Sequence, residues 1–451
     1  MRQQTPLSVV ATIKFGEHEN LKQLLKDIGD NVETDTRFNF KATTTYFGRL
    51  VVLDNDPHFL PLLLFESQFD GSVDNFLDEL LRGSTGLDQV FGKCQGYPPG
   101  GAADVKAFKK WIGKHTVPVM TYYAAYKPLT LAEAKSNLAL RQTVRTELLD
   151  KLDAKGELAR MSPQQVRAAI QKFVSERKLP VGKASMPFLN FADKLTIRTP
   201  PPAGSPVPKD RGWREYLALY AKVNMLGTFG NWLLYTFLPW LVGLILMPFL
   251  WVLHKKEKAD AETYVPPPPV QSMRLNKEFF NVENKLNKNQ MTHHVLVKDG
   301  WFRHTTLRVV LWGIDKLSRV GLTAGRLTDV ATVHFARWIY TDGGKRLLFT
   351  SNFDGPWSAY VGDFVDRTSE YLTGIWSNTN NFPKTRSLIF EGAQDIDGFG
   401  WFLRINQLPT EVWYAAFRSE TVVTIVSTTQ ICQDMDTNIE GERLAAWLRR
   451  F

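Results

Sequence analysis

The sequence predicts an α+β protein in which a β-α-β-β-α-β unit occurs twice. The first observation is a ten-residue motif, LLLFESQFDG at 62–71, that returns as RLLFTSNFDG at 346–355. The second is a set of further matches that flank the motif in the same order, TTYFGRLV with TVHFARWI and YYAAY with WYAAF. The third is that the runs between these matches alternate between β-rich and helical patterns. Ordered matches of this kind indicate an internal duplication.

The elements of the first copy follow from residue patterns in chain order. Runs rich in β-branched and aromatic residues predict strands, and runs with apolar residues three or four positions apart predict helices. The expected series is a strand at 8–15, a helix at 18–29, strands near 43–53 and 61–68, a helix at 72–83 and a last strand within 117–126.

The second copy repeats this series. The expected elements are a strand at 293–298, a helix at 302–320, strands near 331–340 and 346–352, a helix at 356–376 and a last strand within 411–417. Asp354-Gly355 takes the place of Asp70-Gly71. We expect both aspartates to serve as turn and helix-capping residues, because Asp favours both positions.

Each unit so ordered is a ferredoxin-like module, a four-stranded sheet with both helices on one face. Its aromatic strands make an open second face improbable, and two modules in one chain can cover each other sheet against sheet. The paired motif and this order resemble the dimeric α/β-barrel superfamily, and within it uncharacterised bacterial peroxidase-like proteins with two fused modules. The resemblance implies a pseudo-dimeric α/β barrel.

The expected domain boundaries follow from this duplication and from the composition between the copies. They are module 1 at 1–126, a helical insert at 127–198, a linker with an amphipathic lead-in at 199–228, an apolar membrane segment at 229–254, a Pro-rich linker at 255–290 and module 2 at 291–451. Within the insert, Thr130 with Glu133 predicts a capping box for a helix through about Leu152. Ser162-Pro163 predicts the start of a second helix that runs to about Lys178.

A run of 22 uncharged residues, 232–253, predicts attachment to a membrane. As a helix it would reach roughly 33 Å, which is enough to span a bilayer. The aromatic and basic residues at its ends suit the two sides of a membrane interface: Trp232, Trp240, Trp251, Lys255 and Lys256. The alternative is a buried core helix.

A single crossing conflicts with a barrel shared by both modules, because it would place them on opposite sides of the membrane. We therefore expect the segment to bend at Pro239 and Pro248 and dip into one leaflet as a monotopic anchor. The alternative is that barrels form between molecules. The start of the chain has no long apolar run, so we expect the cytoplasmic face of a bacterial inner membrane.

Composition narrows the partners only slightly. The net charge of +9 fits an anionic partner, but it is too small and too evenly spread to choose one. We expect membrane lipid, and no nucleic acid. Cys94 and Cys432 show no CxxC or CxxH spacing, so neither a disulfide framework nor a structural zinc site is supported, and we expect no metal.

Four residues are candidates for a ligand site between the sheets: Tyr46, Arg49, His334 and Arg337. Arg49 and Arg337 hold the same strand position in the two copies, and a buried arginine needs a partner. Either the duplicated aspartates Asp70 and Asp354 neutralise them, or they bind a carboxylate or propionate ligand.

His334 stands where the first copy has Tyr46, and we expect it to share a strand face with Thr332, Ala336 and Trp338. The resemblance implies haem, because in the peroxidase branch of the superfamily a histidine of the second module is the proximal ligand. GAQDIDGFGWFLR at 392–404 is only faintly similar to the GxxDG motif of that branch, and it follows His334 instead of preceding it. The alternative for His334 is a hydrogen-bonded core histidine.

Two functions remain open on the sequence. The first is a membrane-associated barrel that binds an apolar or lipid-derived small molecule, with haem-dependent, peroxidase-like redox chemistry in which His334 and Arg337 are the catalytic candidates. The alternative is a non-catalytic membrane-bound scaffold or assembly factor that docks a protein partner.

Overall fold

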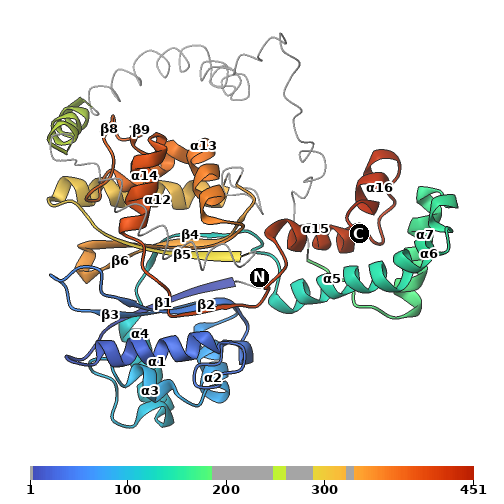
Figure 1. Cartoon of the computed structure of the whole chain (residues 1–451), viewed down its shortest axis with the longest axis horizontal. Coiled ribbons are helices and arrows are strands. Elements are labelled where there is room, and N and C mark those ends of the chain that lie inside the picture. The colour runs from blue at the N-terminus through green and yellow to red at the C-terminus, as the bar shows by residue number, and fades with distance from the viewer. Residues whose placement is uncertain (1–3, 185–246, 261–287, 321–329) are drawn as a thin grey trace, which may run out of the picture.

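The computed structural model describes residues 4–184, 247–260, 288–320 and 330–451. Its body has four layers: helices, a sheet, a second sheet and further helices (Figure 1). An arm of helices extends from one end of the two sheets. The prediction of an α+β fold is confirmed.

The first half of the body follows the predicted order closely. Its elements are β1 (Gln4–Thr12), α1 (His18–Asp30), β2 (Thr45–Leu53), β3 (Leu62–Asp70), α2 (Val73–Gly83), α3 (Leu87–Phe91), α4 (Val105–His115) and β4 (Val119–Ala124). The second half consists of β5 (Lys288–Leu296), α12 (Trp301–Val320), β6 (Val333–Thr341), β7 (Arg346–Asp354), α13 (Trp357–Trp376), β8 (Thr385–Arg386), β9 (Phe390–Glu391), α14 (Ile396–Ile405) and β10 (Val412–Ala415).

Strand pairing recurs in the two halves. β3 pairs with β1 and β2, and β7 pairs in the same way with β5 and β6, all antiparallel. Gln4 faces Asp70 in the first set, and Lys288 faces Asp354 in the second. Both sets also have a register shift at one place, between Thr45 and Phe47 and between Val333 and Phe335.

The last strand of each half joins the other half's sheet. In the described chain the two large sheets have the orders β1-β3-β2-β10 and β4-β6-β7-β5. β4 of the first half therefore pairs with β6, and β10 of the second half pairs with β2. A self-contained ferredoxin-like sheet would keep its last strand beside its first, so the expectation of two such separate modules is not confirmed.

The predicted barrel is wrong, because the strands form two separate sheets. The segment just before each exchanged strand contacts its own half through an isolated bridge, Val9–Thr116 before β4 and His293–Gln407 before β10. These bridges join the sheets at two corners without continuous ladders. A closed barrel needs a continuous ring of paired strands.

The arm contains the predicted insert helices and two helices that the sequence reading missed. The predicted capping box of Thr130 with Glu133 is present, and Ser162, at the predicted start of the second helix, forms another with Gln165. The arm consists of α5 (Leu131–Val144), α6 (Asp150–Ala154), α7 (Pro163–Glu176), α15 (Val422–Gln433) and α16 (Gly441–Leu448). α15 and α16 follow β10 and pack on α5 and α7 through an apolar cluster that includes Val144, Ile170, Ile431 and Trp447.

Most of the predicted membrane segment lies outside the described residues, as do Trp232, Trp240, Pro239 and most of the predicted linkers around it. Its final part is described as a helix over 247–260, which includes Trp251, Lys255 and Lys256. Among the residues described, no helix combines the length and apolar character that crossing a bilayer requires.

Candidate functional site

The space between the sheets is filled by side chains in three zones. Alternate residues of a strand point to the same face, so β2 places Phe47, Arg49 and Val51 along this space. An aromatic zone lies nearest the arm, where Phe47 packs on Phe335 with ring centroids 5.6 Å apart. A charged zone lies in the middle, and an aliphatic zone that includes Val51, Leu64 and Ile339 lies at the far end.

The charged zone is built from Arg49, Arg337 and Glu66. Both guanidiniums are 1% exposed and lie on either side of the carboxylate, with nitrogen–oxygen distances of 3.6 Å for Arg49 and 3.7 Å for Arg337. The other carboxylate contacts are hydroxyls, Ser8 at 2.9 Å and Thr350 at 2.8 Å. Glu66 is therefore the partner of both arginines, and the predicted pairing with Asp70 and Asp354 is wrong.

Each arginine also crosses to the facing sheet. Arg49 donates to acceptors of β5 and β7, namely Gln290 Oε1, the Met291 carbonyl, Thr292 Oγ1, the Ser351 carbonyl and Asn352 Oδ1. Arg337 donates to acceptors of β1 and β3, namely the Leu7 carbonyl, Ser8 Oγ and the Ser67 carbonyl. Burial, countered in part by Glu66, lowers the pKa of Arg49 to about 10. The two side chains join the sheets and need no ligand to do so.

The duplicated aspartates connect the body to the arm. Asp70 accepts from the Tyr46 hydroxyl at 2.7 Å and from the Leu131 backbone N–H, at the start of α5, at 2.7 Å. Asp354 accepts from the Val422 backbone N–H, at the start of α15, at 2.7 Å. The predicted N-cap role is wrong, because the N-caps of α2, α13, α5 and α15 are Ser72, Pro356, Thr130 and Thr421. Each aspartate instead accepts from the first backbone N–H of an arm helix.

His334 contacts Asp354 as Tyr46 contacts Asp70. The register shifts in β2 and β6 fall at these two residues, and a bulge of this kind turns a side chain out of the strand's alternation. The expectation that His334 shares a face with Ala336 and Trp338 therefore fails. Its Nε2 lies 2.8 Å from Asp354 Oδ1, and its Nδ1 lies 3.0 Å from the Tyr126 hydroxyl.

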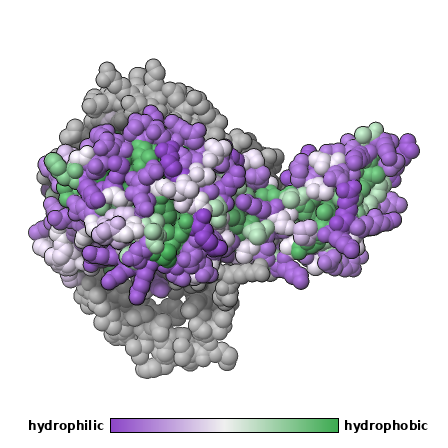
Figure 2. Space-filling view, turned by 90° about the horizontal axis from the view of Figure 1, so that it is seen from below, coloured by the Kyte–Doolittle hydropathy of each residue, from purple (hydrophilic) through white to green (hydrophobic). Residues whose placement is uncertain are grey.

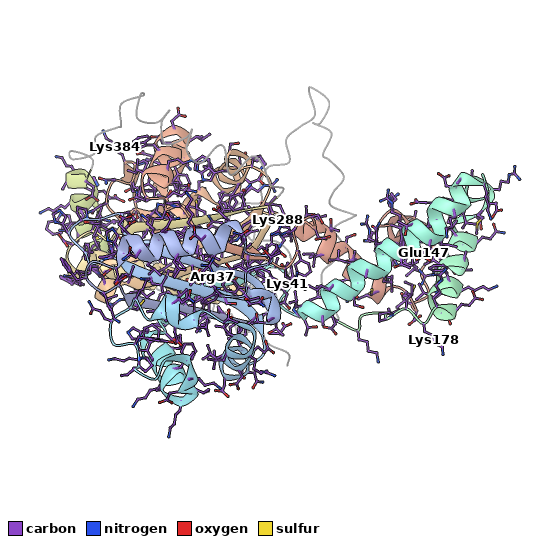
Figure 3. All side chains as sticks on the ribbon, turned by 60° about the horizontal axis from the view of Figure 1, so that its bottom comes forward. Arg37, Lys41, Glu147, Lys178, Lys288 and Lys384 are labelled. Atoms are coloured by element: carbon purple, nitrogen blue, oxygen red, sulfur yellow. The ribbon has the colours of Figure 1, made fainter. Side chains whose placement is uncertain are left out.

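Lys288 completes this cluster, and the sequence reading missed it. Its Nζ lies 3.3 Å from His334 Nε2 and 3.9 Å from Asp354, and it donates to the Glu420 carbonyl just before α15. Figure 3 shows Lys288 at the end of the sheets nearest the arm. Burial, countered in part by Asp354, lowers the pKa of Lys288 to about 8. Burial and the lysine charge together lower the pKa of His334 to about 4.

The residues around His334 do not fit a haem. An axial ligand needs one ring nitrogen free for iron and space for the macrocycle beside it. Both ring nitrogens of His334 are engaged by protein groups, and the side chain is completely buried. Arg49 and Arg337 are engaged by Glu66 and by the facing sheets, so they offer no site for a propionate.

A different feature stands out on the surface, the outer face of α12. Trp301, Val309 and Trp312 are 78%, 60% and 61% exposed, and their spacing places them on one side of the helix. Arg308 and Lys316 are exposed on the same side. We call these five residues the α12 stripe.

The helix over 247–260 lies beside the start of this stripe. Phe249 and Phe302 pack with centroids 5.2 Å apart, and Glu257 accepts from the Ser387 and Leu388 N–H groups at 2.9 and 2.7 Å. Its other side is exposed and apolar, with Met247, Leu250 and Trp251, and the Lys255 ammonium lies 3.8 Å from the Trp251 ring centroid.

The equivalent helix of the first half has the opposite character. α1 covers its sheet as α12 covers the other one (Figure 1). Its exposed residues are all polar: Glu19, Asn20, Gln23, Lys26, Asp27 and Asp30. Figure 2 shows this side of the molecule as mostly hydrophilic, with small hydrophobic patches. The α12 stripe is therefore not a requirement of the fold.

Comparisons with known proteins give no identity to the chain, since no family model, no curated protein and no solved structure matches it.

Sequence reasoning missed Glu66 and Lys288, although both positions carried a signal. Each departs from its equivalent in the other half: Glu66 stands where the second half has Thr350, and Lys288 stands where the first half has Gln4. A charged residue inside a buried, repeated strand requires a partner. Comparing the copies for differences, and not only for matches, would have found both.

Proposed function

We propose that this chain is a monotopic membrane protein that acts by binding at a bilayer surface and not by catalysis. The observation that carries this proposal is the α12 stripe, continued by the exposed apolar side of helix 247–260. Contiguous exposed apolar surface marks interaction sites, and Trp with Lys or Arg is typical of membrane interfaces. A bilayer is the partner we favour, because residues 247–253 of this helix are the end of the uncharged run 232–253.

The strand exchange supports a monotopic arrangement. β4 lies before the apolar segment in the chain and β6 lies after it, yet the two strands pair. Both flanks of the segment therefore belong to one body, whereas a single crossing would require the paired strands to lie on opposite sides of the membrane. The segment is proposed to dip into one leaflet, with Lys255 and Lys256 at the headgroups, on the cytoplasmic face of a bacterial inner membrane.

For the fold, we propose a fused pair of ferredoxin-like modules, related to the dimeric α/β-barrel superfamily, that have exchanged their last strands. The recurring registers support this proposal: Gln4–Asp70 and Lys288–Asp354 stand at the same offset as the two sequence motifs. A relation to peroxidase-like proteins does not imply haem chemistry in this chain, because His334 and Arg337 are engaged by protein groups. A non-catalytic scaffold, the alternative on the sequence, agrees better with a body whose buried charges are paired internally.

Vesicle flotation tests the membrane proposal. The full chain is expected to float with phosphatidylcholine–phosphatidylglycerol vesicles, and deleting 229–246 should weaken this binding. Within that deletion, changing Trp301, Val309 and Trp312 together to Gln should lower the remaining vesicle affinity at least about tenfold, because each of these side chains loses a share of its apolar burial.

The matched control replaces three exposed apolar residues of the first half by Gln: Phe15, Leu60 and Val105. This control should bind vesicles as the parent does. If the full chain stays in solution without detergent and does not float, or if both triple variants lose binding equally, the proposal is overturned.

A further inference from the structure

The second half carries a hairpin that the first half lacks. In both halves a proline precedes a 3₁₀ turn and then an aspartate that caps the next helix: Pro98, Gly101–Ala103 and Asp104 in the first half, and Pro383, Gly392–Gln394 and Asp395 in the second. Two residues, 99–100, separate the proline from the turn in the first half, whereas eight residues, 384–391, separate them in the second. These eight residues contain β8 and β9, which pair with each other. The common fold does not need this insertion, so the hairpin requires an explanation of its own.

The helix over 247–260 holds this hairpin in a strained backbone conformation. Ser387, Leu388 and Glu391 have φ values of 54°, 72° and 64°. Residues with a side chain rarely adopt this left-handed region, and such strain persists only where surrounding groups hold it. Glu257, which is 5% exposed, accepts from the Ser387 and Leu388 N–H groups. The hairpin is therefore fixed to the helix that contains the end of the uncharged run 232–253.

The tip of the hairpin is apolar and open to the outside. Ile389 and Phe390 are 39% and 45% exposed. Ile389 Cγ2 and Val310 Cγ1 of α12 lie 3.8 and 3.6 Å from the place that a Cβ on Gly374 would occupy. The tip therefore lies beside α12 as well as beside the helix over 247–260, and Figure 1 shows β8 and β9 on the outer side of the second half. It adjoins both elements that the proposed function places at a bilayer.

The charges around the tip do not favour an anionic partner. The charged residues of the hairpin and of the turn after it are Lys384, Arg386, Glu391, Asp395 and Asp397. Arg386 Nε lies 3.0 Å from Glu391 Oε1, and Asp395 accepts from the Gly398 N–H at 3.0 Å. The remaining two, Lys384 and Asp397, have opposite charges. The tip thus has no excess of positive charge for an anionic headgroup, and its apolar side chains fit acyl chains instead.

We propose that the β8–β9 hairpin enters the bilayer beside the helix over 247–260, with Ile389 and Phe390 among the acyl chains. This inference rests on the proposed function, to which it adds a second inserting element and the lipid region that the element contacts. A bilayer is the occupant because Glu257 ties the hairpin to the end of the uncharged run. The hairpin is then the part of the second copy that converts a common fold into a lipid-binding one.

A fluorescent label at position 389 tests where the tip lies. Ile389→Cys in the full chain accepts an environment-sensitive nitrobenzoxadiazole label selectively, because Cys94 and Cys432 are buried. Phosphatidylcholine–phosphatidylglycerol vesicles should shift its emission to the blue, and lipids brominated on their acyl chains should quench it. The matched control is Pro99→Cys with the same label, in the equivalent loop of the first half, whose emission should not change.

Replacing the apolar tip tests how much it contributes to binding. Ile389→Gln with Phe390→Gln should lower the vesicle affinity of the full chain at least about tenfold in a lipid titration, because both side chains lose apolar burial. The loss should persist at high salt, because apolar contact is not screened. The matched control is Phe15→Gln with Leu60→Gln, two residues of the first half that are 102% and 62% exposed, and it should bind as the parent does.

The outcomes separate this inference from the proposed function. If the chain floats with vesicles but the label at position 389 keeps its emission in water, the hairpin faces away from the bilayer and this inference alone is overturned. The same holds if the Ile389 and Phe390 variant binds vesicles as its control does. If the full chain does not float, the proposed function fails and this inference fails with it.

Discussion

At the scale of single residues, one backbone site carries two different chemistries in this molecule. Gln4, Tyr46 and Asp70 occupy the positions that Lys288, His334 and Asp354 occupy in the other half. In both places an aspartate joins a strand to the first turn of an arm helix. In the first half the neighbours of the aspartate are the neutral side chains Gln4 and Tyr46. In the second half they are the titratable side chains Lys288 and His334, so the two halves should respond differently to pH.

Acid should weaken the fold through His334. Its pKa is lowered to about 4 in the folded protein, whereas an unfolded histidine has a pKa near 6.5. Between these values the unfolded state binds the extra proton, so stability is lost as pH falls from about 6.5 to 4. We expect His334→Tyr, which copies the first half, to remove about 2 kcal/mol of the loss in unfolding free energy between pH 7 and pH 5.

Urea unfolding followed by tryptophan fluorescence at the two pH values measures this difference. His293 and His294 are also buried with lowered pKa values, so part of the acid loss should remain in the variant. A pH dependence that His334→Tyr leaves unchanged would contradict the role given to this residue.

At the scale of elements, α12 and α1 hold equivalent places in the fold but have different outer sides, apolar in the α12 stripe and polar in α1. Both helices bury an apolar side on their sheet, through Leu21 and Leu25 in α1 and Leu307 and Leu311 in α12. Packing on the sheet constrains the residue types on this buried side only. The outer side is not constrained by this packing, so packing on the sheet does not account for its exposed Trp301 and Trp312.

The attachment of α15 to the body should depend on Asp354. Replacing it by Ala removes the acceptor for the Val422 N–H and leaves Lys288 and His334 without their carboxylate. Loss of the acceptor of one hydrogen bond costs about 1 kcal/mol. Hydrogen–deuterium exchange should therefore speed up over 422–433 by at least about fivefold.

Asp70→Ala is the matched control for this change, because Asp70 accepts from the first N–H of α5 in the equivalent way. It should speed up exchange at the start of α5 and leave 422–433 close to the parent. Equal effects of both variants on α15 would show that the arm responds as one unit and that the effect of this contact is not local.

At the scale of the whole molecule, the strand exchange makes each half depend on the other. A fragment of residues 1–290 would lack β10 beside β2, and a fragment of residues 288–451 would lack β4 beside β6. Each would also expose the inward side of its sheet, where Arg49, Glu66 and Arg337 are paired across the two halves or held by the facing sheet. Unpaired edges and buried charges without partners oppose folding.

We therefore expect neither fragment to fold when expressed alone, and both to assemble when expressed together. Dispersion of amide signals in NMR spectra and co-purification on a tag carried by one fragment are the measurements. A fragment that folds alone with cooperative unfolding would show that the exchanged strands are dispensable.

The sequence by itself determined the local structure of this protein. Strand and helix positions, the two capping boxes and the repeated motif all depend on residues close together in the chain, whose spacing and propensities are visible in the letters. Local patterns did not show that Asp70 and Asp354 accept from the first N–H groups of α5 and α15, because these helices lie far from the aspartates in the chain.

Only the tertiary structure decided how these elements pair. The last strands have the same pattern whether they return to their own sheet or cross to the other one, because hydrogen-bonded pairing does not depend on which chain segment supplies the partner. For the same reason the sequence indicated that Arg49 and Arg337 need a carboxylate partner but did not identify Glu66 as that partner. The bulges that turn the side chains of Tyr46 and His334 form only when the strands are paired in register. The exposed apolar side of α12 became visible only when burial separated its apolar core residues from those left exposed.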